Sequence, residues 1–234
     1  MSAIFPLHAD IVWEPTPDYV ERSHLKTFMD RYGLDSYQDL MNRSTSDVTW
    51  FTRSVLEYLD IQFQKPYSKV VDLSQGIQRP VWCVDGKLNI VHNCLDKWAA
   101  DPKTSDRVAL IWEGEEGHTG SLKYADLARE VNRCANALRE LGFGKGDAIG
   151  LYMPMIPEIV IALMAIAKIG AVILPLFSGY GPGAIATRLN DVGATGLITC
   201  DGVLRRGAIV PMKRTADKAI EEVPDIKHVI VCNR

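Results

Sequence analysis

Two short segments of this 234-residue chain carry side chains that could bind a nucleotide-like ligand. Residues 177–183 hold three glycines around two aromatic rings, so a ligand could approach the backbone closely and stack on a ring. Arg205 and Arg206 are adjacent guanidinium groups that could hold phosphate through forked donors. Each pattern also suits a plain structural role, either a glycine-rich corner with its rings in the core or a solvated surface pair. From these residues alone the prediction stops at an α/β domain with a candidate nucleotide-like ligand site.

Other sequence patterns lack the spacing or the structural context that a ligand or metal site requires. The glycines at 142, 144 and 146 follow an expected helix rather than a strand, so they are not a dinucleotide fingerprint. No Gly-x-x-x-x-Gly-Lys-Ser/Thr loop occurs, and His92 beside Cys94 lacks the remaining ligands of a zinc site. The five cysteines lie far apart, which suits reduced core thiols in a reducing cytosol. These patterns therefore predict no catalytic and no metal-ligating residue.

Composition narrows the class of partner. A formal net charge of -3 offers no basic footprint for nucleic acid and no polybasic patch for a membrane surface. Residues 156–177 are apolar enough to attract a membrane assignment, but Glu158, Lys168 and Gly170 favour a core helix followed by a buried strand. No signal peptide is visible. We expect a cytoplasmic protein whose partners are small molecules or other folded protein.

The expected elements change character along the chain. Residues 1–85 predict a mostly helical extension, with a helix opening at a Ser36 cap and another over 46–59. Residues 86–234 predict a layered α/β domain, in which strands alternate with helices at spacings suited to right-handed crossovers. The continuous apolar run 171–177 favours a parallel sheet buried on both faces. The expected strands are 107–112, 148–154, 171–177, 195–201 and 227–233, and the expected helices are 124–141, 157–169, 181–193 and 215–222.

Ligands of an open parallel sheet gather at the carboxyl ends of its strands. Three loops that follow expected strands are informative there: residues 153–158, 177–183 and 201–207. We therefore expect both candidate segments to lie at one edge of the sheet.

Several motifs, in the same order along nearly the whole chain, resemble acyl-CoA synthetases of the acetyl- and propionyl-CoA synthetase type. Residues 86–96 (GKLNIVHNCLD) are similar to the G-K-L-N-x-x-x-N-C-L-D signature of these enzymes. Residues 111–115 (IWEGE) and 153–158 (MPMIPE) resemble two further motifs, and 168–172 (KIGAV) is similar to a fourth. The resemblance places the chain among adenylate-forming enzymes, as the N-terminal portion of one.

The resemblance implies a two-step reaction. A small carboxylic acid and Mg-ATP give an acyl-adenylate and pyrophosphate, and CoA then takes the acyl group as a thioester. The lysine-bearing Gly/Ser/Thr-rich loop that holds the ATP phosphates, and the lid with its own lysine, do not occur in this sequence. ATP, Mg and CoA are therefore expected for the full-length enzyme, whereas no cofactor is evident for this chain alone. By itself it should be catalytically silent.

What the resemblance leaves in this chain is part of a CoA site. The loop with Phe177, Ser178 and Gly179 would face the CoA adenine, and Arg205 matches the first arginine of an Arg-x-Gly-Arg motif for the phosphates. Ser178 stands where the family usually has glycine. Ala208 stands where the second arginine would be, so Arg206 would have to substitute for it.

Two other classes stay open. The chain could be a stand-alone module that binds CoA or a protein without catalysis, or a Rossmann oxidoreductase, which the missing glycine fingerprint opposes. The closing segment VIVCNR ends on an expected strand, which leaves a sheet edge that native proteins cover. This favours the enzyme fragment and predicts some self-association through exposed apolar surface.

Overall fold

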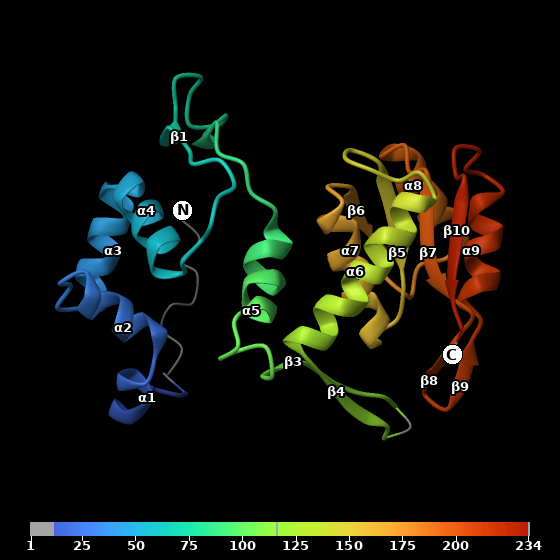
Figure 1. Ribbon diagram of the computed structural model, residues 1–234, viewed down its shortest axis with the longest axis horizontal. Coiled ribbons are helices and arrows are strands. Elements are labelled where there is room, and N and C mark those ends of the chain that lie inside the picture. Colours follow the sequence, from blue (N-terminus) through green and yellow to red (C-terminus); the bar gives the residue numbers. More distant parts are fainter. Residues whose placement is uncertain (1–11, 116, 234) are drawn as a thin grey trace, which may run out of the picture. The chain divides into compact units, whose positions relative to one another are not determined.

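The computed structural model describes residues 12–115 and 117–233 (Figure 1). The chain divides into two compact units. One comprises the residues up to Ile61 together with 65–86, and the other comprises 62–64 with the residues from Lys87 onward.

The first unit is mostly helical, and its sequence explains where each helix begins. Thr16, Ser23, Ser36 and Asp47 each accept a hydrogen bond from the amide three residues later, the usual N-cap arrangement. The predicted Ser36 cap is confirmed, and the helix expected over 46–59 begins at its Asp47 cap. A small core joins the helices, and an antiparallel β-hairpin, which the sequence did not predict, follows them. The elements are α1 (Pro17–Glu21), α2 (His24–Arg31), α3 (Tyr37–Ser46), α4 (Val48–Tyr58), β1 (Lys69–Asp72) and β2 (Val81–Val84).

The second unit is built on a four-stranded parallel sheet in the order β10-β7-β5-β6 (Figure 1). The central strands β5 and β7 are buried along their whole length, as their apolar sequences require. The parallel α/β fold is thereby confirmed. The strands are β5 (Ala148–Tyr152), β6 (Val172–Pro175), β7 (Gly196–Cys200) and β10 (His228–Cys232). The helices are α6 (Tyr124–Glu140), α7 (Pro157–Lys168), α8 (Pro182–Asp191) and α9 (Met212–Ile220).

Two expectations about this sheet are wrong. The run over 107–112 is not its first strand, because β3 (Val108–Glu113) pairs antiparallel with β4 (Thr119–Lys123) in a separate two-stranded sheet. Ile111 is 75% exposed there, so the apolar run is not buried on both faces. The run over 171–177 forms β6 at the sheet edge, where Val172 is half exposed. An edge strand has a neighbour on one side only, which leaves part of an apolar run uncovered.

The sequence also did not predict a short hairpin after β7. Strands β8 (Val203–Arg205) and β9 (Ala208–Val210) pair antiparallel through a two-residue turn. Arg206 and Gly207 both have positive φ, 54° and 74°, as a type I′ turn requires. Such turns usually carry Asn-Gly or Asp-Gly. In the Arg-Gly pair only the glycine is typical, so the sequence indicates this turn weakly.

The apolar stretch 156–177 resolves as α7 and β6, with Gly170 at φ 79° between them. Within residues 12–115 and 117–233, no helix is both long and apolar enough to cross a bilayer. A short π-helix, η1 (His92–Asp96), runs into α5 (Lys97–Ala100) and carries part of the signature sequence.

Candidate functional site

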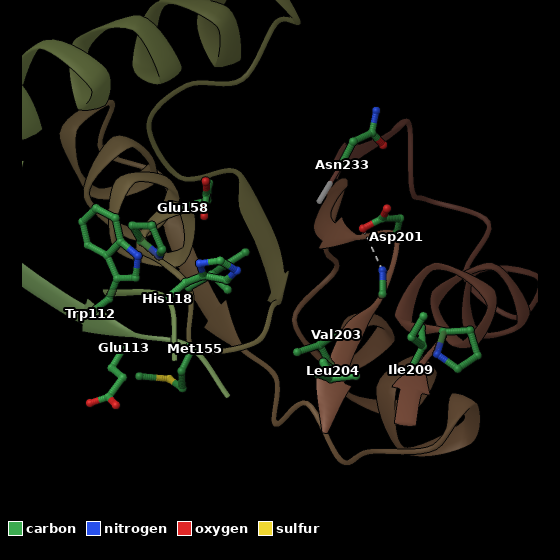
Figure 2. Close-up of a pocket in the computed structure, with 15 residues that line it drawn as sticks. Trp112, Glu113, His118, Met155, Glu158, Asp201, Val203, Leu204, Ile209 and Asn233 are labelled. Carbon is green, nitrogen blue, oxygen red and sulfur yellow. Dashed lines mark hydrogen bonds between the residues drawn. The ribbon is translucent and has the colours of Figure 1, made fainter. Parts of the chain in front are cut away.

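A pocket of about 720 Å³ opens at the carboxyl edge of the parallel sheet (Figure 2). Segments that follow three of the strands form much of its wall: residues 155–158 after β5, residues 201–204 after β7, and Asn233 after β10. The β3–β4 hairpin and the β8–β9 hairpin complete it. Because parallel sheets bind ligands at this edge, the pocket lies where the topology predicts a site. Its other lining residues are Trp112, Glu113, Gly114, His118, Ile209 and Pro211.

The charge of the pocket is acidic. Its walls include the carboxylates of Glu113, Glu158 and Asp201, and Figure 2 shows Glu158 and Asp201 on opposite sides of the opening. Among the described lining residues there is no lysine or arginine, and His118 is the one side chain that could become a cation. Carboxylates repel phosphate groups, so this pocket on its own is a poor place for a triphosphate.

The first predicted segment lies on a tight turn after β6, outside the walls of this pocket. The Tyr180 amide donates to the Phe177 carbonyl oxygen at 2.9 Å and closes the turn over Ser178 and Gly179. A Cβ at Gly179 would lie 2.5 Å from the Phe177 ring, so glycine is needed for that ring to pack on the backbone. The Phe177 ring meets the Tyr180 ring edge-on, with centroids 5.6 Å apart, yet 59% of Phe177 remains exposed. The turn therefore presents a held but accessible aromatic ring.

The second predicted segment lies on the β8–β9 hairpin. Leu204 and Ile209 face each other across the two strands and line the pocket. Arg205 faces Ala208 across the strands in the same way, and side chains alternate along a strand. Arg205 and Ala208 therefore lie on the face opposite to Leu204 and Ile209. Both arginines are exposed outside the pocket walls.

The hairpin is tied to the β3–β4 turn. The Gly207 amide donates to the Glu115 carboxylate at 3.0 Å. This bond joins the two hairpins that contribute to the pocket wall.

The two predicted segments share one edge of the sheet but do not share a cavity. They follow β6 and β7, which flank β5, so their strand ends are separated by about 10 Å, twice the spacing of neighbouring strands. The sequence missed the part of the pocket wall that comes from His118 and the β3–β4 hairpin, because it assigned 107–112 to the parallel sheet. That Phe177, Ser178, Gly179, Arg205 and Arg206 contact CoA stays a prediction.

The signature sequence 86–96 has a structural role in this fold. Asn89 donates to carbonyl oxygens at the end of α7 at 3.0 and 3.3 Å. Asn93 pairs with the backbone of Gln62, accepting from its amide at 2.8 Å and donating to its carbonyl at 3.0 Å. Asp96 forms a half-buried ion pair with Lys168 at 2.6 Å. These side chains join the π-helix segment to α7 and to residue 62, away from the pocket.

We expect Asn93→Ala to lower the free energy of unfolding by about 2 kcal/mol, because it leaves both the amide and the carbonyl of Gln62 without their side-chain partner. Urea unfolding followed by circular dichroism measures this change. Asn132→Ala, at an exposed asparagine on α6, is the control and should change stability by about 0.5 kcal/mol or less. Equal effects of the two substitutions would contradict the structural role of Asn93.

Comparison with known proteins identifies the family. Residues 95–233 match the family described as AMP-binding enzyme, and residues 37–94 match the acetyl-coenzyme A synthetase N-terminus. The chain is 42% identical over 195 residues to an acetyl-coenzyme A synthetase of Gemmatimonas aurantiaca, covering 83% of this chain and 29% of the relative. It is 34% identical over 232 residues to that of Rhodopirellula baltica, covering 96% of this chain and 33% of the relative.

A solved structure agrees with this family assignment. Acetoacetyl-CoA synthetase from Streptomyces lividans superimposes with a TM-score of 0.85 at 26% identity, covering 94% of this chain and 34% of that one. The chain thus spans about a third of the length of these relatives. Since the AMP-binding match alone covers more than half of the sequence, the resemblance seen in the motifs is confirmed: the chain belongs to the AMP-binding enzymes and is similar to the N-terminal portion of acetyl-CoA synthetases.

Proposed function

We propose that this chain is the N-terminal part of an AMP-forming acyl-CoA synthetase that joins a short-chain carboxylic acid to CoA, and that it does not catalyse adenylation by itself. In the whole reaction, the acid displaces pyrophosphate from ATP to give an acyl-adenylate. The CoA thiol then takes the acyl group and releases AMP. On this proposal, residues 1–85 are a helical extension and residues 86–234 are an incomplete AMP-binding domain.

The acidic character of the pocket supports the second half of the proposal. Adenylation requires that the phosphoryl charge be neutralised while the carboxylate attacks, by a backbone cradle, by lysine or by Mg²⁺. The pocket at the sheet edge offers Glu113, Glu158 and Asp201 instead, with no lysine or arginine among its described walls. The described walls of this pocket therefore supply no lysine or arginine to neutralise the charge of a triphosphate.

The turn after β6 and the β8–β9 hairpin support a CoA-facing role. The Phe177 ring is held on Gly179 yet largely exposed, as a stacking partner for a purine must be. Arg205 is an exposed guanidinium on the hairpin that follows β7, two strands away in the sheet, and it can contact a phosphate by two parallel hydrogen bonds. On this proposal CoA binds along the edge, with its adenine at the turn and its phosphates at the hairpin.

Exchange of labelled pyrophosphate into ATP tests the proposal directly. With acetate or propionate, Mg²⁺ and ATP, the 234-residue chain should give no acid-dependent exchange above the blank. The full-length acetyl-coenzyme A synthetase of Gemmatimonas aurantiaca, assayed in the same buffer, is the positive control. Robust exchange by the 234-residue chain would show that it carries a complete adenylation site and would overturn the proposal.

A further inference from the structure

Tyr152 connects the centre of the sheet to the turn at Phe177. It is the last residue of β5 and is 1% exposed. Its hydroxyl donates to the Ser178 carbonyl oxygen at 3.1 Å and lies 3.4 Å from the Tyr180 carbonyl oxygen. Both acceptors belong to the turn that holds the Phe177 ring. A buried side chain on the most central element of the fold thus reaches out to an exposed turn on the neighbouring strand.

The Tyr152 hydroxyl is available as a hydrogen-bond donor to this turn at neutral pH. Burial raises the pKa of the Tyr152 phenol, so the hydroxyl keeps its proton and stays a donor throughout the neutral range.

The turn needs such an anchor. Within it, one backbone bond from the Tyr180 amide to the Phe177 carbonyl closes the chain, and the Phe177 side chain is mostly exposed. A second contact lies beyond it, where the Arg188 guanidinium stacks on the Tyr180 ring at 4.4 Å. An exposed turn held by so few bonds samples other conformations unless a rigid element fixes its carbonyl groups. The buried phenol on β5 is the group that does so.

We propose that Tyr152 is a positioning residue that sets the 177–180 turn in the conformation that receives the adenine of CoA. This inference rests on the proposed function, because it takes the turn as the adenine-facing segment. Its physical basis is preorganisation, since a turn already fixed in its binding conformation loses less entropy when the ligand stacks on it.

The test compares two tyrosine-to-phenylalanine variants of the 234-residue chain. Tyr152→Phe removes the hydroxyl and keeps the buried ring. Tyr32→Phe is the matched control, because the Tyr32 hydroxyl also donates to a backbone carbonyl, that of Ser54 at 2.9 Å, but in the first unit. Calorimetry at a temperature below the Tm of both variants gives the Kd for CoA and for its nucleotide half, adenosine 3′,5′-bisphosphate. Thermal melts give the Tm of each variant.

We expect Tyr152→Phe to raise the Kd of both ligands about five- to tenfold, which is the effect of one lost hydrogen bond. Tyr32→Phe should leave both Kd values unchanged. Both variants should lose a similar amount of Tm, because each loses one bond to a backbone carbonyl. A Tyr152→Phe variant with lowered Tm and unchanged Kd would show a merely structural role and overturn the inference.

Hydrogen exchange tests the anchoring of the turn by Tyr152 independently of CoA binding. If the unaltered chain binds neither CoA nor the bisphosphate, the CoA-facing role of the turn is overturned, and the adenine role of Tyr152 with it. The anchoring itself is measured without ligand by the exchange rate of the Tyr180 amide. That rate should rise about tenfold in Tyr152→Phe and stay unchanged in Tyr32→Phe. An unchanged rate in both variants would overturn the anchoring.

Discussion

Replacing Ala208 with arginine is expected to tighten CoA binding about tenfold. Ala208 faces Arg205 directly across the β8–β9 hairpin, so the two Cβ atoms are about 5 Å apart on one face. An arginine there would place a second guanidinium beside the first, within reach of the same phosphate groups. A charge-assisted contact contributes about 1.5–3 kcal/mol, part of which is lost to repulsion between the two cations. A net gain of about 1.4 kcal/mol corresponds to tenfold in Kd, which isothermal calorimetry measures.

The control for this variant is Ile209→Arg. Ile209 is the next residue on the same strand and is 77% exposed, but it pairs with Leu204 on the pocket face. A cation there adds the same net charge without joining Arg205. Ile209→Arg should therefore increase the affinity for CoA only slightly, and raising the salt concentration should remove that increase. Equal gains in CoA affinity from both substitutions would show that net charge, rather than the face that carries Arg205, governs binding. If Ala208→Arg gives no gain in affinity, the proposal that the hairpin contacts the CoA phosphates is wrong.

The parallel sheet was predictable because its central strands are buried on both faces. Residues 148–152 and 196–200 are apolar or small throughout and lie between helical segments, a pattern that few folds other than a parallel α/β sheet satisfy. The same pattern led to a wrong prediction at 107–112, because a short apolar run does not indicate which strand it pairs with. Trp112 faces Gly120 on β4, and the ring lies over a position that no other residue could occupy without a clash. Recognising that pair requires knowing the register, which local composition does not contain.

The candidate site was less predictable than the fold, because its walls come from segments that are distant in sequence. Glu113, Glu158 and Asp201 look like three unrelated surface residues until the hairpins and strand ends bring them to one pocket. The motif that best identified the family contributed nothing to this pocket. Asn89 and Asn93 satisfy backbone groups in the scaffold, so a recognisable signature can mark a folding requirement rather than a chemical one.

Exposed apolar side chains at the pocket should make the 234-residue chain bind a hydrophobic dye and associate weakly with itself. Met155 is 86% exposed and Ile209 is 77% exposed, and both line the same opening. Large apolar side chains gathered at one opening are usually covered by another part of a protein or by a partner. Fluorescence of Nile red, a neutral hydrophobic dye, measures dye binding, and sedimentation velocity at several concentrations measures self-association.

A double variant, Met155→Gln with Ile209→Thr, should reduce dye fluorescence several-fold and shift the chain toward monomer, without altering net charge. Ile77→Thr is the control, because Ile77 is 83% exposed but lies in the first unit. It should leave both readouts unchanged, since Ile77 does not line the opening. If the unaltered chain is a monomer that does not bind the dye, the opening is not an association surface despite its exposed side chains. The acidic groups around it, Glu113, Glu158 and Asp201, would then be sufficient to keep it hydrated.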